Sequence, residues 1–260
     1  MFSDPLIFAF CLTLFAGLST GIGSLLCLMY KKFNPKFLGI MLGLSAGVML
    51  YVSFVEILAK AKTSLSNVFG DKLGYTYAII GFFVGILLII LIDKILPHHH
   101  NNENEEESTD QKLLRLGLFS AVTLSIHNFP EGLATFLTAL DDPNYGISIA
   151  AAIAIHNIPE GIAVAIPIYY ATKNRKKAFT YSFLSGLTEP IGALIGYYIL
   201  LQFFDESIFG AVFAGVAGMM VYISINELIP TANKYAGKKL STYGIVCGML
   251  IMAVSLVLFV

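Results

Sequence analysis

Two copies of one six-residue pattern, His-Asn-x-Pro-Glu-Gly, hold the side chains of this sequence that are best suited to chemistry. One copy spans residues 127–132 and the other spans residues 156–161, and both lie inside apolar runs. Burying imidazole, amide and carboxylate groups in such surroundings is costly unless the groups are paired or bind a cation. The repeated pattern therefore predicts a cation site inside an apolar structure.

The spacing within each copy places its polar side chains on one face of a helix. His127 and Glu131 are four residues apart, and Asn128 and Glu131 are three apart, so these residues share a face. The second copy repeats the arrangement with its own set: His156, Asn157 and Glu160. Two such faces that meet would combine imidazole and carboxylate ligands, which suit Zn²⁺ and neighbouring first-row ions.

These donors can be sorted into two adjacent metal sites. One site would use both histidines and both glutamates: His127, Glu131, His156 and Glu160. The other would use Asn128 and Asn157, with the two glutamates shared as bridges. Pro130 and Pro159 lack an N–H, so we also expect a kink and freed carbonyl groups beside the two faces.

The composition is that of a polytopic membrane protein. Of the 260 residues, 57% are hydrophobic and only 13% are charged, against about 25% charged in soluble domains. There is no sustained basic stripe, so we expect no nucleic-acid partner. Eight apolar runs are long enough to cross a bilayer: residues 5–30, 36–59, 73–96, 114–139, 146–170, 177–202, 207–230 and 241–260. The expected fold is an all-α integral membrane protein with lipid around it.

Basic residues set the orientation that we expect. With the N-terminus outside, 13 of the 16 Lys and Arg residues fall on the inner side of the membrane, and three fall on the outer side: Lys60, Lys62 and Lys72. Inner loops carry such an excess of positive charge. Both termini should therefore face outward from the inner membrane of the cell.

One segment differs in composition from the rest. Residues 97–113 include His98, His99, His100 and an acidic patch, and we expect a flexible cytoplasmic loop. The simpler interpretation is a solvated connector with no role in binding. The sharper alternative is a weak metal-collecting loop, because imidazole and carboxylate both bind divalent ions.

A weaker repeat relates the two ends of the chain. Residues 17–23 align with 186–192, and residues 46–56 align with 217–227, so spans 1 to 3 correspond to spans 6 to 8. A shift of five spans, an odd number, gives the two triplets opposite orientations, as in many secondary transporters. We therefore interpret residues 1–260 as one transmembrane domain in a 3+2+3 arrangement. Its bounds are inverted repeats 5–96 and 177–260 around central helices 114–170.

Three further carboxylates are candidates for function. Glu189 replaces Thr20 of the repeat in mid-span, which indicates a ligand or ion-path role. Glu56 and Glu227 form a symmetric pair near the outer end of span 2 and the inner end of span 7. They could guide or gate ions, or they could be interfacial residues without a role in transport.

The whole chain resembles the ZIP family of divalent-metal transporters, in its bacterial ZupT/GufA-like branch, on the strength of the paired motifs, the eight spans and the His-bearing loop. The resemblance implies the ZIP fold and a binuclear centre in which Glu189 joins Asn128 and Asn157, with Glu131 and Glu160 bridging. It also implies homodimers, an elevator-like or rocking motion, and uptake of zinc with tolerance of iron, manganese, cobalt and cadmium.

Three functions remain open to the sequence, and transport of a divalent cation into the cytoplasm leads them. A metal-selective, channel-like pore could use the same ligands. An intramembrane metalloenzyme is disfavoured, because the sequence has no His-Glu-x-x-His and the repeated motif supplies no asymmetric acid and base. We therefore expect no enzymatic activity and no organic cofactor, with Zn²⁺ or Fe²⁺ as the substrate.

Overall fold

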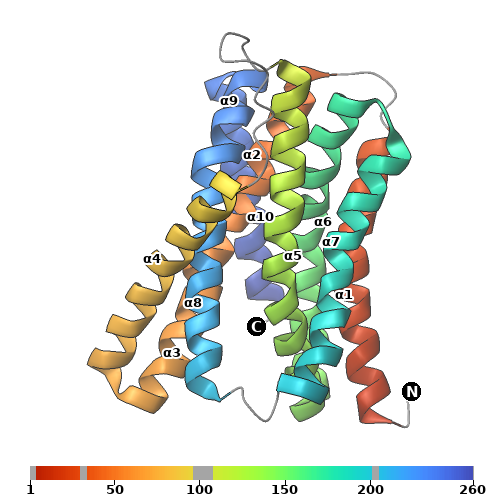
Figure 1. Cartoon of the computed structure of the whole chain (residues 1–260). Coiled ribbons are helices and arrows are strands. Elements are labelled where there is room, and N and C mark those ends of the chain that lie inside the picture. The colour runs from red at the N-terminus through yellow and green to blue at the C-terminus, as the bar shows by residue number, and fades with distance from the viewer. Residues whose placement is uncertain (1–3, 30–33, 96–107, 201–204, 260) are drawn as a thin grey trace.

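The structure is a computed structural model that describes residues 4–29, 34–95, 108–200 and 205–259 (Figure 1). Every regular element within these residues is helical, which confirms the all-α prediction. The eight predicted spans each appear as a continuous helical unit. Single helices form five of them: α1 (Pro5–Leu28), α4 (Asp71–Ile95), α5 (Thr109–Asp141), α6 (Pro143–Thr172) and α10 (Lys238–Phe259).

The other three units each contain a π-helical segment. They are α2 (Pro35–Val52) with η1 (Ser53–Ile57) and α3 (Leu58–Phe69); α7 (Arg175–Ile195) with η2 (Gly196–Leu200); and α8 (Glu206–Ile223) with η3 (Ser224–Leu228) and α9 (Ile229–Ala236). Among the described residues, six units are long and apolar enough to cross a membrane. The remaining two, α5 and α7, contain more polar side chains.

The second and seventh helical units continue well past their predicted ends. The second and seventh runs were expected to end at residues 59 and 230, but their helices continue to Phe69 and Ala236. Each then stops at a glycine with positive φ, 80° at Gly70 and 77° at Gly237, a conformation that other residues rarely adopt. Lys60 and Lys62, which follow the predicted end of the second run, therefore lie on helix α3.

The predicted loop 97–113 is shorter than expected. Ser108 caps α5: its hydroxyl accepts from the backbone of Gln111, whose side chain bonds back to the Ser108 backbone. This capping box starts the helix at Thr109, so the last five residues of the predicted loop are helical. The three candidate loop ligands, His98, His99 and His100, lie outside the described residues.

Helices α5 and α6 continue through Pro130 and Pro159. Each proline lacks the N–H that would bond the carbonyl four residues earlier, so that carbonyl has no donor from it, as expected. Irregular turns that were not predicted occur at η1 and η3. Each starts at a serine whose hydroxyl donates to the carbonyl four residues earlier, Ser53 to Met49 at 2.6 Å and Ser224 to Met220 at 2.8 Å. Such back-bonding competes with the regular helical ladder.

The helices form two groups, which Figure 1 shows side by side. Helices α1, α5, α6 and α7 pack on one another, whereas α2 packs on α10 and α8 packs on α4. Glycines permit the close approach within the first group: a Cβ on Gly161 would lie 1.9 Å from the carbonyl oxygen of Thr20, and one on Gly132 would lie 2.0 Å from that of Glu189. These contacts hold the two motif-bearing helices against α1 and α7.

Candidate metal centre

Helices α5 and α6 bring the two motifs together in the middle of the protein. The six polar side chains of the two motifs are all buried, with at most 8% of any residue exposed: His127, Asn128, Glu131, His156, Asn157 and Glu160. The i, i+4 spacing predicted from the sequence therefore places both polar faces against each other and away from lipid.

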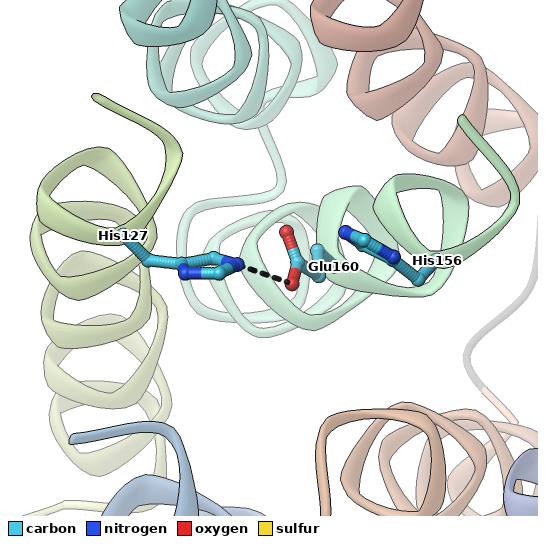
Figure 2. Close-up of side chains that lie close together, drawn as sticks. All are labelled: His127, His156 and Glu160. Carbon is cyan, nitrogen blue, oxygen red and sulfur yellow. Dashed lines mark ion pairs between the residues drawn. The ribbon is translucent and has the colours of Figure 1, made fainter. Parts of the chain in front are cut away.

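Glu131 lies between the two imidazoles. Its Oε2 is 3.1 Å from Nε2 of His127, and its Oε1 is 3.0 Å from Nε2 of His156. Figure 2 shows His127 pointing from α5 toward Glu160 on α6, where the two side chains are 3.7 Å apart between Nε2 and Oε1, with His156 on the far side of Glu160. His127, His156 and Glu160 each offer a ligand atom within 4.8 Å of the others.

The asparagines are held through their amide nitrogens. Asn128 donates from Nδ2 to the carbonyl of Ser185 at 3.1 Å, and Asn157 donates to the carbonyl of Ala16 at 3.0 Å. Asn157 also donates to Oε1 of Glu189, which is fully buried on α7. The structure therefore places Glu189 beside the second motif.

Many polar atoms of this cluster are buried without a hydrogen-bond partner. They include Nδ1 of each histidine, Oδ1 of both asparagines, both oxygens of Glu160 and Oε2 of Glu189. Buried polar atoms are rarely left in this state. Lone pairs from imidazole, carboxylate and amide groups are together the donors that bind divalent first-row cations, so the cluster has the chemistry of a metal centre.

Known proteins are similar to this chain over almost its whole length. The family profile described as ZIP Zinc transporter matches residues 93–256. A protein of Chlorobaculum parvum named "Zinc transporter ZupT" is 60% identical over 266 residues, covering 99% of both chains. Proteins with the same name from Oceanobacillus iheyensis and Streptococcus mutans are 54% and 52% identical, each over at least 98% of both chains.

The chain belongs to the ZIP zinc transporter family. This confirms the family resemblance, including the bacterial ZupT-like branch, and agrees with a multi-pass membrane protein.

In this ZIP chain Glu56 and Glu227 are not members of the buried cluster, although Glu56 lines a small cavity together with Glu131 of that cluster. Each is in a π-helical segment inside a long helical unit, and not near a helix end as predicted, because α3 and α9 extend both units. Glu56 pairs with Lys60 at 2.9 Å. Glu227 accepts from Nδ2 of Asn226 at 2.9 Å and lines a separate cavity of about 330 Å³.

The sequence motifs did not reveal which groups orient the asparagines. These are backbone carbonyls, of Ala16 for Asn157 and of Ser185 for Asn128. Ala16 and Ser185 directly precede the repeated segments 17–23 and 186–192. Combining the weak repeat with the paired motif would have drawn attention to these positions, although a carbonyl acceptor has no side-chain signature.

Proposed function

We propose that this ZIP chain carries divalent metal cations across a membrane, with Zn²⁺ as its leading substrate, through the centre formed by its two motifs. The observation that carries the proposal is the convergence of His127, Glu131, His156 and Glu160 from two helices into one buried cluster. The names of the relatives, which are zinc transporters, support the choice of metal.

The donor atoms favour two metal positions. The imidazoles with Glu131 and Glu160 form a set suited to Zn²⁺, Fe²⁺ and Co²⁺, and the two asparagines with Glu189 form an oxygen-rich set that also suits Mn²⁺. Cd²⁺ belongs with the same proposed range of substrates. The unpartnered Oδ1 atoms and Oε2 of Glu189 support this second position. Glu131 and Glu160 would bridge the two ions.

An inverted repeat is the second part of the proposal. Equivalent glycines of the repeat make equivalent contacts. Gly161 meets the carbonyl of Thr20 as Gly132 meets that of Glu189, and Thr20 aligns with Glu189 in the repeat. The same holds for Gly23 at Ile158 and Gly192 at Phe129, whose carbonyl oxygens lie 2.0 Å from the position of an added Cβ. These matched pairs support two halves of opposite orientation around α5 and α6.

The packing of the helices indicates which of them would move together during alternating access. The helices that pack around the motifs, α1, α5, α6 and α7, come from both repeats and from the centre. We therefore propose that this four-helix group moves as a unit against the remaining helices. The metal would travel with the group between the two sides of the membrane.

The proposal also covers the membrane that holds the protein, its orientation there and its oligomeric state. The distribution of basic residues favours the inner membrane of the cell with both termini outside, so that transport brings metal into the cytoplasm. Large apolar side chains along α4 and α10 are exposed and suited to lipid, including Phe83, Leu87, Val246 and Leu250. From the family resemblance we also propose that two copies of the chain form a homodimer.

Metal entry into proteoliposomes tests the function. Vesicles holding a metal-sensitive dye would receive Zn²⁺, Fe²⁺ or Mn²⁺ with the intact protein, with a variant carrying His127→Ala and Glu131→Ala, and with Ser148→Ala as a control on α6 away from the centre. We expect saturable flux in the intact and control proteins and none in the double variant. Equal flux in all three would refute the role of the motifs, and flux that rises linearly with concentration would favour a pore.

A further inference from the structure

A charged pair stands between two cavities on the side of the protein where α3 lies. The larger cavity, of about 740 Å³, is formed between α3 and the end of α10, and Glu56 and Lys60 line it. The smaller, of about 30 Å³, is also lined by Glu56 and Lys60, and Glu131 of the metal centre lines it as well. Glu56 and Lys60 therefore line both cavities, one of which also reaches Glu131 of the metal centre.

The smaller cavity has the size and the charge for one cation. Its volume is close to the space that one water molecule takes in the liquid, about 30 Å³. Among the described residues its lining has two carboxylates, Glu56 and Glu131, and one ammonium group, Lys60; the other lining residues are Ile57, Ala134, Thr138, Ile149, Ile153 and Phe213. A dication that crosses such apolar walls needs a carboxylate at each step, because an unpaired charge is costly there.

One carboxylate oxygen of Glu56 accepts a hydrogen bond, and the other has no hydrogen-bond partner. Its Oε1 accepts from Nζ of Lys60 at 2.9 Å, whereas its Oε2 is buried and has no hydrogen-bond partner. Glu56 is 15% exposed and Lys60 is 41% exposed, so the lysine can swing into the larger cavity when it leaves the carboxylate. The lysine end of this pair is partly exposed, and ion pairs with a solvated partner are weak and therefore easily exchanged.

Lys60 has no basic counterpart at the equivalent position of the other half of the repeat. Glu56 aligns with Glu227, but the position that corresponds to Lys60 is Thr231. The ammonium group is thus absent at the equivalent position of the other half. This asymmetry is what a device acting on only one direction of metal movement would show.

We propose that Glu56 binds the incoming dication before Glu131 does, and that Lys60 occupies its carboxylate as a tethered counter-cation until the dication displaces it. The inference rests on the proposed transport function and assigns it an entry position on the α3 side. Release of Lys60 leaves Glu56 free for the dication, and return of Lys60 helps to pass the dication on to the centre.

Zn²⁺ uptake kinetics from the α3 side test the proposal. The C-terminal end of α10 lines the larger cavity together with α3, so a C-terminal affinity tag selects vesicles with this side outward. For Glu56→Gln we expect KM to rise about three- to tenfold with Vmax nearly unchanged, and Glu56→Asp should restore KM toward the native value. Lys60→Gln should lower KM, and the double variant should behave like Glu56→Gln.

Controls separate this proposal from the underlying function. Thr63→Val alters the larger cavity without touching the charged pair and should keep the native KM, and unfolding temperatures establish that each variant is folded. A native KM in folded Glu56→Gln, or an effect of Lys60→Gln that persists when Glu56 is absent, would overturn the proposal. Glu131→Gln serves as the reference. If it still transports, the proposed function itself fails; if it is inactive while Glu56→Gln is normal, only the entry position fails.

Discussion

Replacing Gly161 by alanine should damage the metal centre through the packing of α6 on α1. The added Cβ would lie 1.9 Å from the carbonyl oxygen of Thr20, and ordinary contact begins at 3.4 Å, so the helices must separate by about 1.5 Å. One turn away Asn157 donates to the carbonyl of Ala16 at 3.0 Å. A comparable separation takes that bond beyond about 3.2 Å and breaks it.

The expected cost combines two effects. Overpacking a dense core costs about 1–3 kcal/mol, and the lost hydrogen bond adds about 1 kcal/mol. We therefore expect the unfolding temperature in detergent to fall by roughly 5 to 15 °C, together with weaker Zn²⁺ binding. Gly21→Ala is the matched control on α1, because its Cβ would meet a movable side chain, Phe183, at 3.2 Å. Equal unfolding temperatures for the Gly161 and Gly21 variants would refute the packing explanation.

Three further substitutions give distinct results. Gly132→Ala should lower the unfolding temperature as much as Gly161→Ala, because its Cβ would lie 2.0 Å from the carbonyl oxygen of Glu189; an unchanged temperature would contradict the matched contacts. Gly237→Ala should cost about 1–3 kcal/mol through its positive φ alone, since no atom lies within 4 Å of the added Cβ; native stability in thermal unfolding would count against this. Asn157→Leu should reduce bound zinc, measured by elemental analysis, from two ions per chain to one, and retention of two would argue against an asparagine ligand.

The sequence was sufficient to predict the meeting of the two motifs. Eight apolar runs set the helices, and the four-residue spacing of His127 and Glu131 set the face of α5 that turns inward. The length of an apolar run and the spacing of residues on a helix are local properties, and both can be read from a single sequence. Burial of the polar residues follows, because a lipid-facing carboxylate would be too costly.

Other features do not follow from apolar runs and motif spacing and were not predicted. The extension of two helices to Phe69 and Ala236 reflects polar helical turns beyond the apolar runs, which a hydropathy criterion does not count. Two π-helical segments, η1 and η3, begin at serines whose hydroxyls donate to the carbonyl four residues earlier, but a serine in the regular helix α5 makes the same bond, so serine alone does not predict a π-helical turn. The carbonyl of Ala16 reaches Asn157 only through the packing of α1 on α6.

Locating bound zinc in the protein tests the central proposal most directly. Crystals grown with Zn²⁺ would be measured at the zinc absorption edge, where anomalous scattering marks the ions. We expect one peak about 2.0–2.2 Å from the nitrogen and oxygen ligands of His127, His156, Glu131 and Glu160, and a second peak beside Asn128, Asn157 and Glu189. Zinc peaks elsewhere, with none between the two motifs, would contradict the assignment of this cluster as the metal centre.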